Sequence, residues 1–498
     1  MRQLSAARAA PAARWGMWLA CVAVVAVGAT AVAVRTDRES AVALAMLALA
    51  TSGAIAAILW HAAPAMTFIV AVLLSPIAGW WNLLHVPGTF SPQRLLLVVG
   101  VGAVLLRAPA VAHRRPLPTS AIHYALALAS VYVVVSAAVA GTLTDKSTFF
   151  KLFETFGILL FVVFYVAPAA FASRRHRDAL LMALLLLGGY LGVTAILETT
   201  GPRSLVLPSY IENPAVGIHW GRARGPFLEA VTNGTALYLG AAAAVAAMAL
   251  WRSTRARMCA GVVLLVCCLG MMFSLQRSVW LAALIATLTA GLAIGALRRY
   301  VGVLLLVVAI VAGIVYTLAP SDEVSARLNQ QDTVWQREDL NTAALNMITA
   351  RPLIGFGWGT FPEASLAGDF YEQAPDHPLQ GFAFQVHNEF LSHGAELGLV
   401  GFTLWFGCLV AAAAWVLKSP TPDDDLRIWK AVFLAYAVFY LVVSNFVPPQ
   451  FFPNLMFWLL AGVAAAGRAR RPDSKADAPS RWFADSPRLR VLKVVNDR

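Results

Sequence analysis

The chain has 498 residues, of which 59% are hydrophobic and only 13% are charged, and its formal net charge is +12. Soluble globular domains carry about 25% charged residues, so this composition excludes a soluble protein and makes the bilayer the expected solvent. The apolar runs are continuous and close to the roughly 20 residues that a spanning helix needs, whereas the strands of a membrane barrel alternate in polarity over ~10 residues. We therefore expect an all-α, polytopic integral membrane helix bundle.

The apolar runs predict fourteen membrane-spanning helices, with about 12 as the alternative because the two runs within 41–81 are barely separated. The first run is long for the apolar core of a signal peptide, so we expect a retained helix. The predicted spans are 15–34, 41–60, 63–81, 94–110, 121–141, 152–172, 178–197, 235–251, 258–275, 278–297, 300–319, 397–417, 428–447 and 452–467.

Basic residues lie mostly in short clusters between these runs, where they set helix orientation rather than bind nucleic acid. They place both termini in the cytoplasm and predict the following organisation. We expect a cytoplasmic segment at 1–14, a bundle of about 11 helices at 15–319 with an outside loop at 198–234, a large non-cytoplasmic loop at 320–396, C-terminal membrane helices at 397–467, and a basic, disordered cytoplasmic tail at 468–498.

The five cysteines lie in or beside apolar runs, and no CxxC spacing occurs among them. We interpret them as small buried apolar side chains rather than disulfide or metal partners. They are Cys21, Cys259, Cys267, Cys268 and Cys408.

The large loop contains an amphipathic helix predicted from Thr333 to Ala350. Pro352 ends it, because proline does not continue a helix. Its predicted apolar stripe comprises Trp335, Leu340, Leu345 and Ile348.

A glycine-rich run, Gly355-Phe356-Gly357-Trp358-Gly359, follows this helix. It is not a nucleotide-binding loop, because it does not follow a strand and faces a compartment without ATP. We expect a tight turn, with stacking of Trp358 and Phe356 on sugar rings as the alternative.

Four arginines are predicted to lie on the side that the positive-inside rule keeps poor in basic residues. An ionisable group at membrane depth indicates function unless it merely reaches the lipid headgroups. Because guanidinium binds phosphate through a fixed fork of donors, an anionic membrane-borne ligand is the functional interpretation. The four are Arg222, Arg224, Arg277 and Arg337.

His387 stands where the large loop enters the next span, and an imidazole there is a candidate general base. A metal site formed with His377 and His393 lacks any recognised ligand spacing, so we expect none. Glu389 and Glu396 are interpreted as residues of the helix surface.

Four blocks of sequence, in order along residues 220–445, resemble the O-antigen ligase/polymerase superfamily. The strongest is His387-Asn388 followed, after nine residues, by Gly398-Leu399-Val400-Gly401, which is similar to that group's H[NSQ]-x9-G signature. The others are Arg222-Ala223-Arg224-Gly225-Pro226-Phe227, the turn Ser274-Leu275-Gln276-Arg277-Ser278 with one extra residue before its arginine, and Arg337 followed by Ala350-Arg351-Pro352-Leu353-Ile354-Gly355-Phe356-Gly357.

This resemblance implies a GT-C-like bundle that transfers a glycan from undecaprenyl diphosphate to an acceptor, without a nucleotide, a metal or another cofactor. It implies that His387 is the base and that Arg277, Arg337 and one of Arg222 and Arg224 bind the diphosphate or glycan. Supporting positions are Asn388, Gly355, Gly357, Trp358 and Gly398.

The resemblance also implies a multi-pass protein of the bacterial inner membrane whose active face is periplasmic or extracellular. Its partners would be the lipid-linked glycan donor, a glycan, lipid or protein acceptor, and membrane lipids. The histidine signature favours ligase-type transfer; a polysaccharide polymerase is the alternative. A small-solute transporter is a distant third, because neither an inverted repeat nor a broken midplane helix is evident.

Overall fold

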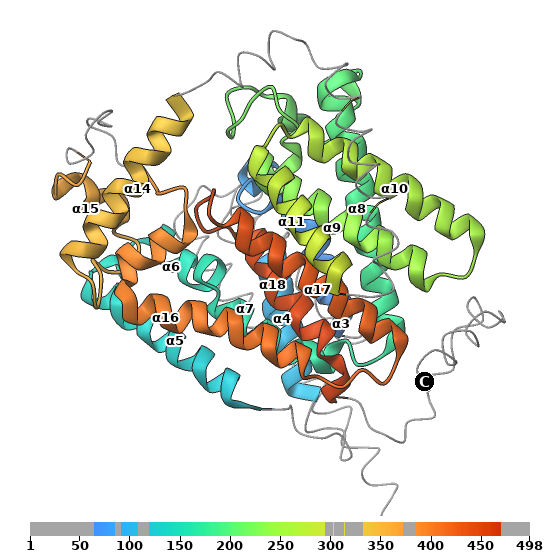
Figure 1. Cartoon of the computed structure of the whole chain (residues 1–498), viewed down its shortest axis with the longest axis horizontal. Coiled ribbons are helices and arrows are strands. Elements are labelled where there is room, and N and C mark those ends of the chain that lie inside the picture. Colours follow the sequence, from blue (N-terminus) through green and yellow to red (C-terminus); the bar gives the residue numbers. More distant parts are fainter. Residues whose placement is uncertain are drawn as a thin grey trace, which may run out of the picture.

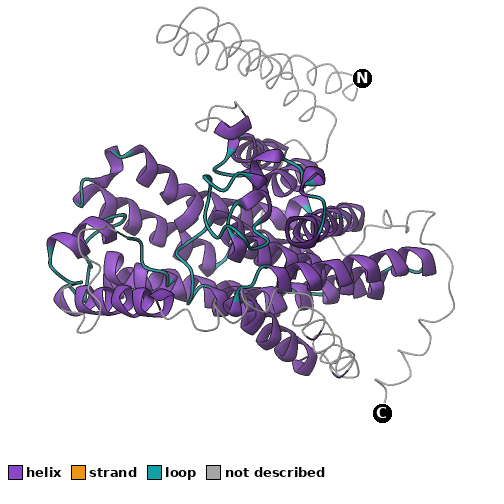
Figure 2. Cartoon of the chain, turned by 90° about the horizontal axis from the view of Figure 1, so that it is seen from above, coloured by secondary structure: helices purple, strands orange, loops and turns teal. Residues whose placement is uncertain are grey.

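The computed structural model describes residues 64–84, 91–107, 119–293, 332–371 and 384–469, together with the isolated positions 302 and 313. Every regular element in these ranges is helical and none is a strand (Figure 2). The expectation of an all-α, polytopic membrane protein is thereby confirmed. The predicted spans 15–34, 41–60 and 300–319 lie outside the described residues, so the helix count stays a prediction.

Within the described ranges, seven helical segments are long and apolar enough to cross a membrane. They are α5 (Ala121–Val139), the combined segment of α6 (Lys146–Lys151), η5 (Leu152–Phe156) and α7 (Ile158–Ala170), α8 (Arg174–Thr200), α9 (Ala230–Leu250), α10 (Thr254–Phe273), α16 (Glu389–Leu417) and α17 (Asp424–Val443). Four shorter apolar helices accompany them, namely α3 (Pro64–Leu74), α4 (Pro92–Arg107), α11 (Arg277–Ala293) and α18 (Phe451–Ala464).

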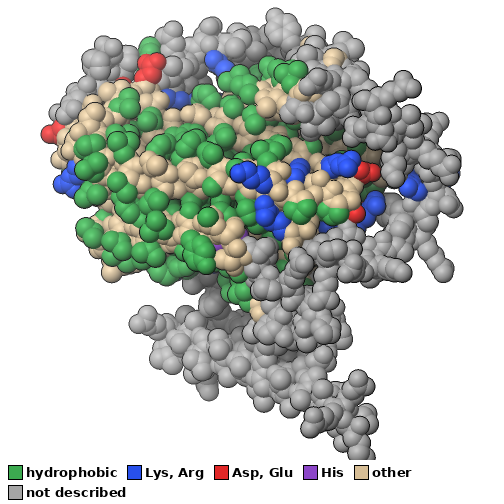
Figure 3. Space-filling view, turned by 60° about the horizontal axis from the view of Figure 1, so that its bottom comes forward, with side chains coloured by type: hydrophobic (Ala, Val, Ile, Leu, Met, Phe, Trp, Pro, Cys, Tyr) green, Lys and Arg blue, Asp and Glu red, His purple; other side chains and the backbone are tan. Residues whose placement is uncertain are grey.

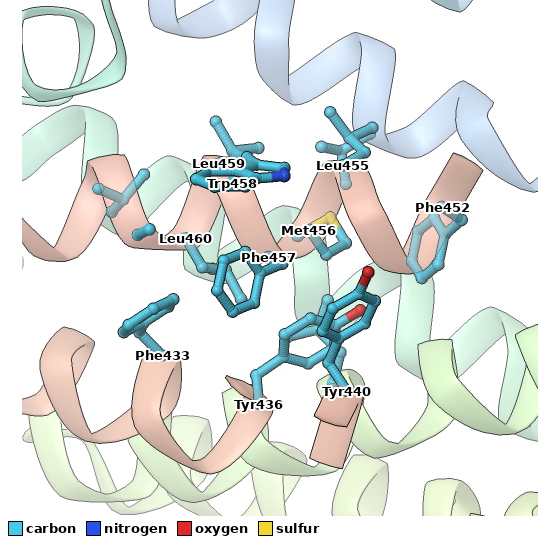
Figure 4. Packing of buried hydrophobic residues seen from close by; sticks show 14 of the residues in the cluster. Phe433, Tyr436, Tyr440, Phe452, Leu455, Met456, Phe457, Trp458, Leu459 and Leu460 are labelled. Carbon is cyan, nitrogen blue, oxygen red and sulfur yellow. The ribbon is translucent and has the colours of Figure 1, made fainter. Parts of the chain in front are cut away.

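Helix α18 lies at the centre of the bundle, and all of its residues from Phe452 to Ala464 are buried. It packs on α17 through interleaved aromatic and aliphatic side chains (Figure 4). The edge-to-face pair of Phe433 and Phe457 is typical of this contact, with ring centroids 5.4 Å apart. By contrast, α5 and α10 leave most of their apolar side chains on the surface, as expected of helices that face lipid.

Charged residues mark one end of the bundle. The end where α8 and α17 begin holds a buried ion pair, in which Arg177 Nε donates to Asp425 Oδ2 at 2.7 Å. The same guanidinium donates to the carbonyls of Phe171 and Ala172. Figure 3 shows Lys and Arg side chains gathered on one part of an otherwise largely apolar face. Such a distribution is typical of a membrane protein with one basic end.

A small helical layer lies beside the start of α16 and consists of α14 (Asp332–Ala350) and α15 (Phe361–Ala367) (Figure 1). The predicted helix is present, but its predicted stripe is partly wrong because Leu345 is 52% exposed. The buried face instead runs through Leu340, Ala343, Ala344 and Met347, which pack on Phe361, Tyr371, Val386 and Ala395. The small side chains of Ala343 and Ala344 let α14 pack closely on α16. The hydropathy pattern favoured the larger apolar residues and so did not predict this buried face.

Helix α16 is broken at Gly398, whose backbone (φ 65°, ψ −177°) is open essentially to glycine alone. The amides that lose their helical partners are satisfied by the two residues that follow α14 closely and precede the glycine-rich run: Leu399 N donates to Pro352 O at 2.7 Å and Val400 N to Leu353 O at 3.2 Å. Backbone groups buried away from water must be paired in this way.

The carbonyls freed on the other side of the break are also paired. Phe356 N donates to Ala395 O at 3.0 Å, Gly357 N donates to Glu396 O at 2.8 Å, and the hydroxyl of Tyr132 donates to Leu397 O at 2.7 Å. The glycine-rich run with the two residues Pro352 and Leu353, and the break in α16 at Gly398, lie about 40 residues apart in the sequence and are held together by these backbone hydrogen bonds. We call this contact the joint. The expectation of a tight turn at Gly355–Gly359 is confirmed.

Candidate functional site

Arg222 lies in the loop between α8 and α9, in a turn closed by a hydrogen bond from its own amide to the carbonyl of His219 (3.2 Å). The next amide, of Ala223, donates to Phe273 O at 3.0 Å, at the last residue of α10. Ala223 and Phe273 also share a small buried cluster with Ala195. These contacts fix the half-buried Arg222 beside the end of α10.

Arg277 follows that same end of α10 after a three-residue turn. Leu275 has a left-handed backbone (φ 50°), and Gln276, which is buried, offers its carbonyl to the amides of Val279 and Trp280. Gln276 thus occupies the cap, and Arg277 is the first residue of α11, with an exposed side chain. The Ala223–Phe273 bond therefore brings the loop of Arg222 to the turn of Arg277.

Arg224 is different, because its side chain is buried and its donors are used within its own loop. Its guanidinium donates to the carbonyls of Ile211, Asn213 and Val216 at 2.6–2.8 Å. It also lies 4.6 Å from the ring centroid of Trp220. These contacts hold the loop together and leave Arg224 little capacity for a ligand.

Arg337 projects from the second turn of α14 and is half-buried. Burial lowers its pKa, and the positive charge of Arg277 lowers that pKa further. Because Coulomb interactions weaken with distance and with exposure to water, this coupling places the two guanidiniums in one region. Arginine stays charged despite such a shift, so two cations from sequence positions 60 residues apart share one region.

His387 is exposed and lies two residues before α16. Burial by the surrounding protein lowers its pKa, as does the charge of Arg337, while a hydrogen bond to the backbone of Gln385 partly offsets both. The imidazole is therefore neutral at neutral pH, which is the form that accepts a proton. Asn388 caps α16, since its side-chain oxygen accepts from Leu391 N at 3.1 Å.

Glu389 and Glu396 are not surface residues, and that interpretation is wrong. Both are buried, with exposures of 1% and 2%. Glu389 accepts hydrogen bonds from the hydroxyls of Tyr440 (2.8 Å) and Ser444 (2.7 Å), and Glu396 accepts from Phe361 N at 3.1 Å. The two carboxylates thus tie the start of α16 to α17 and to α15, and so fix the position from which His387 projects.

Trp358 is buried at 3% exposure and packs edge-on against Phe156, with ring centroids 5.4 Å apart. Its position excludes the alternative that it stacks on a sugar ring. The glycines beside it have positive φ, and a side chain at Gly355 would collide with the backbone of Glu396. Gly355, Gly357 and Trp358 therefore support the site by closing the joint with α16.

Two residues of this region escaped the sequence analysis: His219 and Glu229. His219 Nδ1 lies 3.7 Å from Glu229 Oε1 and accepts a long hydrogen bond from Ala230 N (3.4 Å). Burial lowers the pKa of His219 to about 4, with further lowering from Arg222, Arg337, His387 and Arg224. The only signal in the sequence was a histidine three residues before an outside arginine, which is too weak to select it.

We call Arg222, Arg277, Arg337, His219 and His387 the arginine–histidine cluster. Its members come from three separate segments of the chain and are linked by the electrostatic couplings and backbone contacts above. Such an arrangement can bind a multiply charged anion and can accept a proton next to it. In the described part of the chain, no group of three or more His, Cys, Asp or Glu side chains is arranged to hold a metal ion.

Comparison with known families gives one match: residues 261–406 match the family described as O-antigen ligase. The matched segment contains Arg277, Arg337 and His387 together with both halves of the interlocked joint, and it excludes Arg222 and His219. A search of curated proteins found no match. The match supports a membrane protein of the O-antigen ligase or polymerase type.

Proposed function

We propose that this chain, in which residues 261–406 match the O-antigen ligase family, transfers a glycan from a polyprenyl diphosphate to an acceptor hydroxyl on the non-cytoplasmic face of the bacterial inner membrane. The observation that carries the proposal is the arginine–histidine cluster, where three arginines and a neutral histidine meet at one end of the bundle. That end is opposite the basic end marked by Arg177.

The arginines bind the diphosphate in this proposal. Arg277 is the first residue of α11, where the helix dipole already carries partial positive charge, so a cation there is unfavourable unless an anion lies nearby. Free amides at a helix start are themselves phosphate donors. Arg337 adds a second guanidinium whose field overlaps that of Arg277. Of the two candidates in the first outside loop, Arg222 is the ligand-binding residue, because the donors of Arg224 are already used.

His387 acts as the general base. Its neutral imidazole takes the proton from the acceptor hydroxyl, the acceptor oxygen forms a bond to the anomeric carbon, and the bond from that carbon to the phosphate oxygen breaks. The electron pair leaves on polyprenyl diphosphate, whose growing negative charge the arginines stabilise. Proton removal by a positioned base typically contributes about 100- to 10,000-fold in rate.

The decisive experiment replaces His387 by glutamine and measures surface glycan in a strain whose own copy of this gene is deleted. His176, at the opposite end of the bundle, provides the matched control as His176→Gln. We expect loss of the glycan only for His387→Gln, at equal membrane levels of both variants. Normal glycan in the His387 variant would refute the proposed base.

A second experiment tests the arginines and the kind of product. Arg277→Lys keeps the charge but loses the bidentate fork, so we expect at least about a 10-fold loss of activity, while Arg351→Lys in the large loop serves as control. Arg351 is exposed and stacks on Phe356 with 4.6 Å to the ring centroid. With a purified donor, a single transferred chain indicates a ligase and a ladder of repeats indicates a polymerase.

A further inference from the structure

His219 is held more tightly than a loop histidine needs to be. Its backbone is left-handed (φ 61°), a conformation that is strained for a residue other than glycine. On one side Ile218 N donates to Leu228 O at 2.9 Å, and on the other the His219 carbonyl closes the turn to Arg222. Strain of this kind persists where the surrounding structure requires a particular side-chain position.

The hydrogen bond at Nδ1 decides which ring nitrogen carries the proton. Nδ1 accepts from Ala230 N, so the neutral imidazole has its hydrogen on Nε2. Glu229 lies on the Nδ1 side at 3.7 Å and is itself fixed, because its carboxylate caps α9 by accepting from Val231 N and Thr232 N. The side chain of Gln450, just before α18, also donates to Glu229 at 3.3 Å. His219 therefore presents Nε2–H as its remaining donor.

The charged groups around this imidazole come from every neighbouring segment. Arg222 and Arg224 belong to its own loop, Glu229 to the start of α9, Arg337 to α14 and His387 to the segment before α16. Three cations and one carboxylate therefore act on a ring whose side chain is 28% exposed. The balance is positive, and it opposes an additional proton on His219 as long as no anion is bound.

We propose that His219 is a further donor-binding residue, which contacts the diphosphate through Nε2–H and takes up a proton when that anion binds. This inference rests on the proposed function, because it concerns the same anion. Two negative charges placed among the arginines cancel the local excess of positive charge. The added proton goes to Nδ1, whose long hydrogen bond from Ala230 N is then broken, and Nδ1–H faces the carboxylate of Glu229. Protonation adds one more positive charge next to the leaving group without any metal ion.

The size of the expected pH dependence of affinity follows from the change in the pKa of His219 on binding. If binding restores His219 from a pKa of about 4 to the ordinary value of about 6.5, affinity becomes about 10-fold tighter at about pH 5.5 than at about pH 8. The sign follows from proton uptake: the complex holds a proton that the free protein lacks, so lower pH favours binding. A purely structural role for His219 gives no such dependence.

The test uses the full chain in detergent and a farnesyl-diphosphate-linked hexose as the probe. Each phosphate of this probe carries one ester bond and one anhydride bond and so keeps a single, strongly acidic oxygen, which means that the charge of the probe stays constant across the pH range. Affinity is measured by calorimetry in the His387→Gln background, which removes the other imidazole of the cluster. The binding heat is measured in two buffers that differ in ionisation enthalpy, and the difference between the heats gives the number of protons taken up. This measurement does not require a substitution at His219.

We expect about 10-fold tighter binding at the lower pH in His387→Gln, with uptake of a proton, and a flat profile in the double variant His387→Gln with His219→Gln. The probe could bind in a way that Arg277→Gln weakens, yet with an affinity independent of pH and without proton uptake. That result would overturn the role of His219 and leave the proposed function intact. If the wild-type chain does not bind the probe, both the proposed function and this inference fail. Thermal unfolding of each variant checks that the fold is intact.

Discussion

Replacing Gly398 by alanine should disrupt the joint between the glycine-rich run and α16. The backbone at Gly398 (φ 65°, ψ −177°) costs any other residue about 1–3 kcal/mol, and a Cβ there would overlap the carbonyl group of Leu353. An alanine straightens the helix or displaces Leu353. Either response breaks the hydrogen bonds of Leu399 and Val400 to the carbonyls of Pro352 and Leu353, each worth about 0.5–1.5 kcal/mol.

The sum is a loss of about 2–6 kcal/mol for Gly398→Ala, concentrated where α14 and α15 dock. Because His387 begins the same segment of α16, we expect transfer activity to fall with docking. The assays are thermal unfolding in detergent, hydrogen exchange of residues 352–361, and glycan transfer by the purified chain.

Gly407 offers a control within the same helix. It is exposed, a Cβ there meets nothing within 4 Å, and alanine improves helix propensity by about 1 kcal/mol. Gly407→Ala should therefore keep stability and activity. Equal stability, exchange and activity of the two alanine variants would refute the idea that the break at Gly398 holds the site together.

Two further predictions concern charge. Arg177→Ala leaves Asp425 buried without its partner and should cost about 3–5 kcal/mol of stability, measured by thermal unfolding. Arg427→Ala removes the pair of Arg427 and Asp424, whose side chains are 70% and 64% exposed, and should cost less than about 1 kcal/mol. Similar melting temperatures for the two variants would contradict the prediction for Arg177. Because burial and Arg337 lower the pKa of His387, the acid limb of the transfer rate should lie below about pH 6.5, and Arg337→Gln should move it to higher pH by removing a positive neighbour. An acid limb that stays in place in that variant would show that another group limits the rate.

Sequence alone was sufficient for the class of protein and for the path of the chain. Lipid requires every backbone group to be paired within its own element, so spanning helices appear as continuous apolar runs. The runs at 121–141 and 428–447 accordingly correspond to α5 and α17 within a few residues. Motif spacing similarly singled out Arg277, Arg337 and His387, which the structure links by electrostatic coupling.

Spacing alone did not settle which of two neighbouring polar residues faces a ligand. Arg222 and Arg224 are equivalent in the sequence, and only the three carbonyls that surround Arg224 separate them. The same holds for Glu389 and Glu396, which look like surface carboxylates until α17 and α15 supply their hydrogen-bond donors. Burial of a polar side chain depends on partners contributed by distant segments.

The large loop contributes Arg337 and His387 but not the whole arginine–histidine cluster. The sequence by itself determined a helical membrane protein and the order of the segments that carry the arginines and His387, because hydropathy and spacing are local properties. The tertiary structure decided that Gly355 and Gly398 form one joint and that His219 joins the arginines. Both depend on contacts between segments far apart in the chain, which no local pattern encodes.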